Sequence, residues 1–354
     1  MPRSIHNVNI ESILPLESPR EIKSLLPVED SLVERIAGFR DDIVRILNRE
    51  DKRLLVLVGP CSIHDVKAAQ EYAERLSVLR KELAGSLYIV MRVYFDKPRT
   101  SLGWRGMIVD PFLDGSYNIQ EGLVRARRLM LRITEMGIPI GTEVLDPIIP
   151  QYTVDLVSWA AIGARTIESQ THREISSGLS MPVGFKNGTD GNLVNAVNAI
   201  RSAREGHSFI GIDQDGRTCV LKTRGNSAGH IILRGGIHGP NYYEENVEET
   251  EDLLTDIGLL PAVVVDCSHA NSGKEHTRQA RVFRAATDLR VRGHQSIRGV
   301  MLESNLISGR QEIPEDMPAG RLVYGQSVTD ACIGWDETEK LLRDAAEMLG
   351  RSGL

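Results

Sequence analysis

Eight short apolar runs constrain the fold of this chain more than any other feature of its sequence. Each run has the length and composition of a buried strand, and longer helix-like stretches separate one run from the next. One such stretch has apolar residues at three- and four-residue steps from Ile119 to Met136, followed by Gly137, which is well placed to end a helix. The runs are residues 54–58, 87–94, 138–144, 161–167, 181–185, 230–233, 262–266 and 297–302.

Strands that alternate with helices indicate an α/β fold with a parallel sheet. Eight such repeats favour a (β/α)8 TIM barrel, and a doubly wound sheet is the competing interpretation. In a barrel, the residues that do chemistry lie at the carboxyl ends of the strands. The residues that end or follow each run are therefore the candidates for a functional site.

Two segments break the alternation. An arm formed by residues 1–50 carries no strong strand, and an insertion at about residues 209–226 is typical of a hairpin that turns at Asp215-Gly216. The arm ends in a plausible amphipathic helix through Leu32, Ile36, Ile43 and Ile46. We expect residues 1–50 to serve regulation or oligomerisation, and residues 51–354 to form the catalytic barrel with the inserted hairpin.

Composition excludes several classes of function. The length of 354 residues suits one barrel with extensions, and the formal net charge of −6 argues against a general nucleic-acid binder. No apolar run approaches the ~20 residues that a membrane helix needs, and the N-terminus lacks a signal pattern. None of the four cysteines pair as CxxC, which favours free thiols in a reducing compartment. We therefore expect a cytoplasmic protein without nucleic-acid or membrane partners.

Cationic residues recur at the predicted strand ends. A single Arg or Lys after a strand is usually a solvated loop charge. Several that converge on one barrel mouth would repel each other unless an anion neutralised them, and Arg offers a bidentate fork for carboxylate or phosphate. The pattern predicts a small, multiply charged substrate rather than a polymer. The cations are Arg92, Lys97, Arg99, Arg165, Lys186 and Arg234, and Thr100 and Glu143 lie beside them in the sequence pattern.

A second set of strand-end residues could bind a metal ion: Cys61, His269, Glu303 and Asp330. Sulfur, imidazole and carboxylate ligands together suit Mn, Fe, Co or Zn better than Mg. Each residue also has an ordinary structural interpretation, so the residues alone leave the metal open. The sequence contains no GxG and no GxxxxGK[ST], which removes support for a dinucleotide fold or a P-loop.

Long sequence blocks that contain these residues closely resemble class I 3-deoxy-D-arabino-heptulosonate-7-phosphate (DAHP) synthases of the feedback-regulated bacterial and fungal type. The resemblance implies a condensation of phosphoenolpyruvate with erythrose 4-phosphate, the first step of the shikimate pathway. It covers nearly the whole chain beyond the arm. The blocks are VGPCSIHD (58–65), MRVYFDKPRT (91–100), GARTIESQTHRE (163–174), PVGFKNGTDG (182–191), HIILRGG (230–236), VVDCSHANS (264–272) and YGQSVTDACIGW (324–335).

The resemblance also implies roles for individual residues. Cys61, His269, Glu303 and Asp330 would ligate one divalent metal, which would either activate the aldehyde or position the water. Arg92, Lys97, Arg165, Lys186 and Arg234 would hold phosphoenolpyruvate, beside Glu143 as an orienting group. Arg99 and Thr100 would hold the phosphate of erythrose 4-phosphate, and Lys97 would transfer a proton to the new alkoxide. Catalysis would depend chiefly on Lys97, Cys61 and His269.

Members of this family carry extensions that build a distal aromatic amino-acid site and a homodimer or homotetramer. Gly211 resembles the tyrosine-sensitive branch, because a glycine leaves room for the phenolic oxygen of the effector; its simpler interpretation is a backbone requirement of the hairpin. Ile167 and the loop at residues 235–240 depart from the commonest family pattern, but neither removes a proposed ligand. The implied effector residues are Pro150, Gln151, Leu179, Ser180, Phe209, Gly211 and Leu221.

Three other functions remain to be weighed. The related 3-deoxy-octulosonate 8-phosphate synthase typically has a KANRSS-like segment where this chain has KPRT. A non-catalytic, amino-acid-sensing paralogue would be free to lose the metal and cation sets, which this chain retains. A metal-dependent hydrolase of a neutral bond would have little use for so many cations around one metal.

Overall fold

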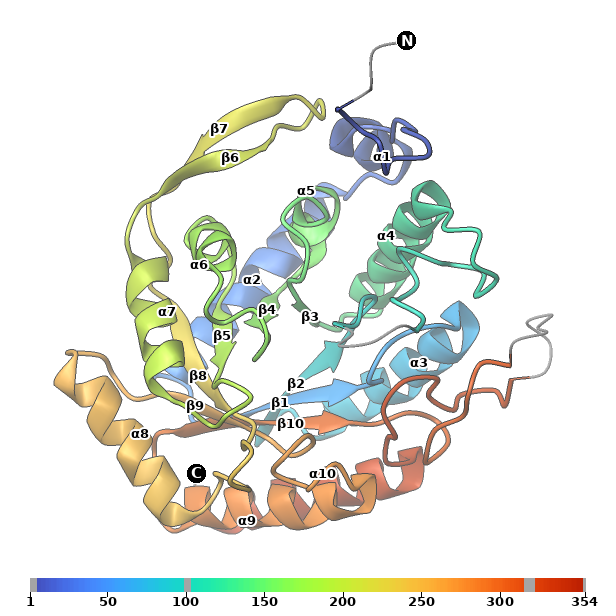
Figure 1. Cartoon of the computed structure of the whole chain (residues 1–354). Helices are drawn as coiled ribbons and strands as arrows, with labels where there is room; N and C mark the ends of the chain where they lie inside the picture. The colour runs from blue at the N-terminus through green and yellow to red at the C-terminus, as the bar shows by residue number, and fades with distance from the viewer. Residues whose placement is uncertain (1–4, 99–102, 315–321, 353–354) are drawn as a thin grey trace.

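The computed structural model describes residues 5–98, 103–314 and 322–352. Its centre is a closed barrel of parallel strands in the order β1-β10-β9-β8-β5-β4-β3-β2, which confirms the predicted TIM barrel (Figure 1). All eight predicted runs contribute a strand. The barrel strands are β1 (Leu54–Gly59), β2 (Leu87–Arg92), β3 (Ile140–Glu143), β4 (Trp159–Ile162), β5 (Val183–Lys186), β8 (Gly229–Leu233), β9 (Val263–Asp266) and β10 (Ile297–Glu303).

A helix follows each barrel strand and covers the outside of the barrel (Figure 1). In α4, Asn118 caps the start by accepting a hydrogen bond from the amide of Glu121, and Gly137 takes φ +80° just after the end, as predicted. No helix within the described ranges is both long and apolar enough to cross a membrane. The outer helices are α3 (Val66–Glu82), α4 (Ile119–Glu135), α5 (Pro150–Thr153, continued by a 3-10 turn at Val154–Leu156), α6 (Gln170–Ser176), α7 (Val194–Arg204), α8 (Glu244–Asp256), α9 (Gln279–Val291, preceded by a 3-10 turn at His276–Arg278) and α10 (Trp335–Arg351).

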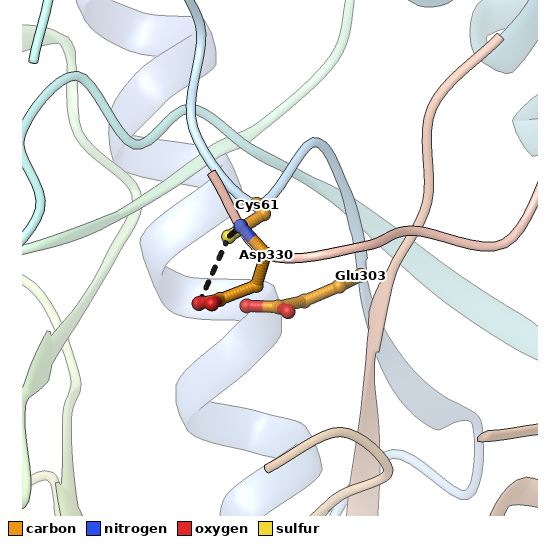
Figure 2. Close-up of side chains that lie close together, drawn as sticks. All are labelled: Cys61, Glu303 and Asp330. Atoms are coloured by element: carbon orange, nitrogen blue, oxygen red, sulfur yellow. Dashed lines mark hydrogen bonds between the residues drawn. The ribbon is translucent and has the colours of Figure 1, made fainter. Parts of the chain in front are cut away.

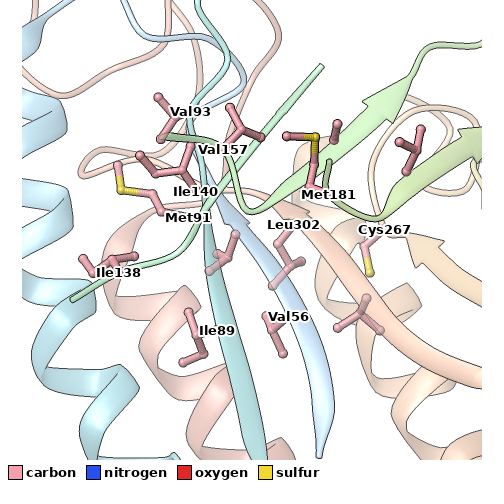
Figure 3. Packing of buried hydrophobic residues seen from close by; sticks show 14 of the residues in the cluster. Val56, Ile89, Met91, Val93, Ile138, Ile140, Val157, Met181, Cys267 and Leu302 are labelled. Atoms are coloured by element: carbon pink, nitrogen blue, oxygen red, sulfur yellow. The ribbon is translucent and has the colours of Figure 1, made fainter. Parts of the chain in front are cut away.

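The alternation of side chains along each strand divides the apolar core into two parts. The larger part lies between the strands and the outer helices, and Figure 3 shows some of its members, among them Val56, Ile89 and Leu302. The smaller part contains residues of the other parity, such as Leu55, Leu57 and Val90, and we assign it to the barrel interior. Side chains that continue this second parity toward the carboxyl ends of the strands must reach the barrel mouth.

The predicted amphipathic helix is α2 (Asp30–Leu47), which closes the base of the barrel. Its residues Ile43 and Ile46 belong to the interior part of the core and have no exposed surface. Arg298, buried on β10, donates to the carbonyl oxygens of Ile46 and Asp51 at 2.6 Å each. The second half of the N-terminal arm is therefore packed as part of the barrel core.

The predicted hairpin is present as antiparallel strands β6 (Ser208–Ile212) and β7 (Thr218–Lys222). It arches over the outside of the barrel toward α1 (Pro19–Leu25), as Figure 1 shows. Arg20 of α1 donates its backbone N–H to Gln214 at 2.8 Å and forms an ion pair with Asp215 at 2.6 Å. The first helix of the arm and the tip of the hairpin thus form one joined structure.

The predicted fourth strand was placed too late in the chain. Residues 161–167 were expected, whereas β4 covers Trp159–Ile162. The chain turns at Gly163, whose carbonyl accepts from the amide of Thr166 at 3.1 Å. A Cβ at Gly163 would lie 2.5 Å from a carboxylate oxygen of Glu143, so the glycine permits a close approach that a strand residue with a side chain would prevent.

Candidate active site

A cavity of about 990 Å³ opens at the carboxyl ends of the barrel strands. It brings together most of the substrate and metal candidates that the sequence singled out, although they are spread over more than 230 positions of the chain. Arg99 and Thr100 lie outside the described residues. The predicted site residues that line the cavity are Arg92, Lys97, Glu143, Arg165, Lys186, Arg234, His269, Glu303 and Asp330.

The two-residue period of the strands explains why these side chains meet. Arg92 follows Val90, and Glu303 follows Met301, at a spacing of two residues. Val90 and Met301 belong to the interior core, so the polar residue two positions later points into the mouth of the barrel. Arg165 differs, because it lies in the turn after β4 rather than on the strand, where the sequence had placed it.

Carboxylates partner three of the cations within the mouth. Lys186 lies 3.4 Å from Glu143 and 3.6 Å from Asp266. Arg92 lies 3.2 Å from Glu303, and Lys97 lies 3.7 Å from the same carboxylate. These acidic residues already neutralise part of the positive charge, so the cations do not repel each other as strongly as the sequence predicts.

Arg165 and Arg234 have no carboxylate partner within the part of the chain that the structure describes. Arg234 is buried, and its guanidinium donates to the carbonyl of Gly235 at 3.2 Å. Burial lowers the pKa of Arg234, with the charge of Arg165 acting in the same direction against the opposing effect of Asp266. Because no described carboxylate pairs with these two guanidinium groups, they form the part of the mouth best suited to an added anion.

Three of the four proposed metal ligands form a compact cluster, shown in Figure 2: the ligand atoms of Cys61, Glu303 and Asp330 lie within 4.8 Å of one another. The sulfur of Cys61 accepts hydrogen bonds from the hydroxyl of Thr329 at 3.2 Å and the amide of Asp330 at 3.4 Å. Donors that point at a sulfur stabilise the thiolate form, which is the form that binds metal.

The charges around the cluster also fit a bound cation. Burial raises the pKa of the Cys61 thiol to about 12, and the carboxylate of Glu303 acts in the same direction. Burial would raise the pKa of Asp330 as well, but Lys97 and His269 lower it to about 2. A buried thiol beside two carboxylates ionises readily only when a strongly bound cation takes the place of its proton. The donor set therefore suits a divalent metal.

His269 lines the same cavity but is not a member of the compact cluster. Its Nδ1 lies 2.9 Å from Asp266, and its backbone has φ +54°, a left-handed conformation that is uncommon outside glycine. The hydroxyl of Ser268 is hydrogen-bonded to the same nitrogen at 2.8 Å, so Nδ1 is held by the protein and Nε2 is the nitrogen left for a metal, which is the usual arrangement around a metal-binding histidine.

Comparison with known proteins identifies the family of this chain. Residues 27–343 match the DAHP synthetase I family. A Tyr-sensitive phospho-2-dehydro-3-deoxyheptonate aldolase from Escherichia coli (strain K12) is 50% identical over 341 residues, covering 96% of this chain and 95% of the relative.

The chain belongs to the DAHP synthetase I family. A Trp-sensitive relative from the same strain is 48% identical over 342 residues, covering 97% of this chain and 96% of that protein. The solved structure of phospho-2-dehydro-3-deoxyheptonate aldolase from Francisella tularensis SCHU S4 has a TM-score of 0.93 and 44% identity, covering 97% of this chain and 99% of that one. The similarity therefore extends over the arm and the hairpin as well as the barrel.

The effector residues implied by the DAHP synthase resemblance come from three segments: the start of α5, the loop after α6 and the hairpin. Phe209 pairs with Leu221 and Gly211 with Cys219, so these side-chain positions share the less exposed face of the hairpin. Gln151 of α5 accepts from Gln214 at the hairpin tip at 3.0 Å. Pro150, Gln151, Leu179, Phe209, Gly211 and Leu221 are buried or partly buried, whereas Ser180 is exposed.

Asp266 is a polar residue of the DAHP synthase mouth to which the sequence assigned no role. It has no exposed surface, and it contacts both Lys186 and His269. Burial would raise its pKa, but His269 and Lys186 hold that pKa well below the ordinary value, so the carboxylate stays ionised. Its position two residues after Val264 of the interior core was the signal that could have identified it.

Proposed function

We propose that this chain condenses phosphoenolpyruvate with D-erythrose 4-phosphate to give DAHP and inorganic phosphate. One observation carries the proposal: a single cavity is lined by two guanidinium groups that no described carboxylate pairs, by carboxylate-paired ammonium groups, and by the two carboxylates of a compact sulfur–oxygen ligand cluster. This combination suits two phosphorylated substrates and a metal. The relatives of this chain, which are phospho-2-dehydro-3-deoxyheptonate aldolases, support the same reaction.

In this proposal, the cations of the mouth bind phosphoenolpyruvate. Arg165 and Arg234 hold its phosphate, while Arg92, Lys97 and Lys186 contact its carboxylate end and Glu143 orients it. Arg99 and Thr100 bind the phosphate of the sugar. Two anions that repel each other in water are thereby held together, which is a contribution of proximity and of preorganised charge.

The reaction then forms one carbon–carbon bond, adds water and breaks one carbon–oxygen bond. The methylene carbon of phosphoenolpyruvate forms a bond to the aldehyde carbon of the sugar, and the aldehyde oxygen becomes an alkoxide. Water adds to the carbon that carries the phosphate, and phosphate leaves with cleavage of the C–O bond. The Nζ of Lys97, which lies 3.3 Å from Asp330, is the group we assign to protonate the alkoxide.

We propose that Cys61, His269, Glu303 and Asp330 hold one divalent ion, Mn, Fe, Co or Zn. When bound, such an ion supplies Lewis-acid activation of an oxygen or positions a water molecule. The protein supplies the remaining features from its own residues. Asp266 orients His269, and the amide and hydroxyl donors around Cys61 favour its thiolate.

We propose that an aromatic amino acid, tyrosine in preference to phenylalanine or tryptophan, inhibits the enzyme at the hairpin site. A Cβ at Gly211 would lie 2.6 Å from a methyl group of Leu221, so any larger residue would have to displace a side chain of the same site. This crowding supports a role for Gly211 in making room for the effector. Residues 1–50 would then divide into a regulatory helix, α1, and a structural base, α2.

We also propose a homodimer or homotetramer in the cytoplasm. Ile210 and Val220 project from the outer face of the hairpin and are 78% and 65% exposed. Ile5, Val8 and Leu14 of the N-terminal segment are also at least 65% exposed. Apolar side chains gathered on extensions of a barrel are suited to burial against a second copy of the chain.

The experiment that tests the function measures phosphate release from phosphoenolpyruvate with erythrose 4-phosphate or with arabinose 5-phosphate. We expect release with the four-carbon sugar, loss after thorough chelation, and recovery when a divalent metal is returned. Preference for arabinose 5-phosphate would favour the octulosonate synthase instead. Absence of release with either sugar, together with intact amino-acid binding, would favour the non-catalytic paralogue.

A further inference from the structure

The interior-facing row of β2 does not end at Arg92. Two residues later, Tyr94 continues the same parity, lines the cavity and is only 3% exposed. The guanidinium carbon of Arg92 lies 4.0 Å from the centre of the Tyr94 ring, so the two side chains are stacked in the wall of the mouth.

Both side chains carry a buried donor that no described residue satisfies. The hydroxyl of Tyr94 and the Nε of Arg92 each lack a hydrogen-bond partner in the described part of the chain. Most buried polar groups in folded proteins are hydrogen-bonded, because an unsatisfied one costs free energy. Two such donors on stacked neighbours inside a substrate cavity indicate an acceptor that arrives with a ligand.

Other buried tyrosines of this chain show what a structural hydroxyl looks like. Tyr72 has no exposed surface and donates to the hydroxyl of Ser304 at 3.0 Å. Tyr88, on the same strand as Arg92 and 1% exposed, donates to the carbonyl of Phe39 at 3.4 Å. Tyr94 is buried like these two, but no residue that the structure describes offers its hydroxyl a comparable partner, so the described part of the fold does not explain this hydroxyl.

The surroundings of Tyr94 define the acceptor. Burial raises the pKa of Tyr94 while the charges of Arg92 and Lys186 oppose that rise, so the phenol keeps its proton at neutral pH and can donate it. Adjacent cations attract anionic oxygen atoms. A phenol adds a further donor without adding another positive charge to a wall that already contains Arg92 and Lys186.

We propose that Tyr94 is a substrate-binding residue whose hydroxyl, together with Nε of Arg92, donates to an anionic oxygen of phosphoenolpyruvate. The inference rests on the proposed function and deepens it by assigning a neutral donor to the phosphoenolpyruvate site. It gives the hydroxyl a partner only in the complex, so the free protein gains no stability from it.

The test compares Tyr94→Phe with Tyr88→Phe, a matched change on the same row of β2. Each variant and the unchanged protein is titrated with phosphoenolpyruvate alone in the presence of manganese ions, and each is melted without ligand. We expect Tyr94→Phe to weaken phosphoenolpyruvate binding at least about tenfold and to leave the melting temperature unchanged or higher. Tyr88→Phe should lower the melting temperature and keep the affinity within about twofold.

Two outcomes would overturn the assignment. One is an affinity of Tyr94→Phe for phosphoenolpyruvate within about twofold of the unchanged protein, even if turnover falls, because the hydroxyl would then serve a water or a later step. The other is a loss of melting temperature equal to that of Tyr88→Phe, which would make the hydroxyl structural. If the unchanged protein itself fails to bind phosphoenolpyruvate, the proposed function fails instead, so the two failures are distinguishable.

Discussion

Replacing Lys186 by methionine separates the two tasks that its ammonium group performs. The side chain is 5% exposed and lies between the carboxylates of Glu143 and Asp266, at 3.4 and 3.6 Å. Lys186→Met keeps the length of the side chain but leaves both buried carboxylates without this partner. Removing one member of a buried ion pair costs about 3–5 kcal/mol, so we expect the free energy of unfolding to fall by roughly that amount.

The same substitution removes a charge-assisted contact to the substrate in our proposal. Such a contact contributes about 1.5–3 kcal/mol, which corresponds to a loss of phosphoenolpyruvate affinity of about 10- to 150-fold. The double variant Lys186→Met/Glu143→Gln distinguishes the two effects. Removing the charge of Glu143 relieves part of the uncompensated burial, so stability should recover in part while the substrate affinity should not.

Urea unfolding and calorimetric titration with phosphoenolpyruvate measure the two quantities on the same samples. Lys340→Met, which removes an exposed lysine on α10, is the control for loss of one positive charge and should change neither quantity measurably. Full affinity in Lys186→Met, or recovery of affinity in the double variant, would refute the assignment of Lys186 to the substrate.

Four further perturbations have defined outcomes. Cys61→Ala should lose both turnover and bound metal, measured by atomic emission, whereas Cys219→Ala on the hairpin should keep both. Burial, with the nearby Asp146, raises the pKa of Asp96 to about 7, so the stability that its protonated form provides is complete below about pH 4 and is lost as the pH rises to 7. Asp96→Asn should make the fall in the free energy of unfolding between pH 4.5 and pH 7.5 smaller by up to about 4 kcal/mol. Urea unfolding at the two pH values measures this fall, and a fall equal to that of the unchanged protein would contradict the prediction. Gly211→Ser should weaken inhibition by tyrosine, and inhibition by phenylalanine stronger than by tyrosine in the unchanged enzyme would exclude the proposed effector. Ile43→Ala should lower the free energy of unfolding by about 2–5 kcal/mol, because α2 closes the barrel; a change below about 0.5 kcal/mol would show that this helix is a dispensable arm.

Much of the barrel could be predicted because a buried parallel strand is a short apolar run whatever its partners are. The hairpin could be predicted equally well, because Asp-Gly between two apolar segments is typical of a tight turn. Gly216 does take φ +75° there. The end of β4 could not be predicted in the same way. The turn there depends on Gly163 and on how closely Glu143 of the neighbouring strand approaches it, and such an approach across strands leaves no trace in the local pattern.

The parity of the strands was the signal that the sequence offered and that remained unused. Asp266 lies two residues beyond Val264, just as Glu303 lies two residues beyond Met301. Applying the spacing that predicts Glu303 to the strand that contains Val264 would therefore have identified Asp266. The same spacing of two residues leads from Arg92 to Tyr94, which also lines the cavity. Which cation each carboxylate contacts, however, depends on the stagger of strands around the closed barrel, and a list of strand-end residues does not contain that stagger.

The stagger of the strands decides which cations of the mouth are already paired. Lys186 and Arg92 are held by Glu143, Asp266 and Glu303, so an incoming anion at those positions competes with carboxylates already present, and part of its binding energy is offset. No described carboxylate holds Arg165 or Arg234 in this way, so an anion there meets less competition. Phosphate carries more negative charge than a carboxylate and benefits most from bidentate guanidinium donors. This difference between the two ends of the mouth supports the proposal that phosphoenolpyruvate binds with its phosphate toward Arg165 and Arg234 and its carboxylate toward Arg92 and Tyr94.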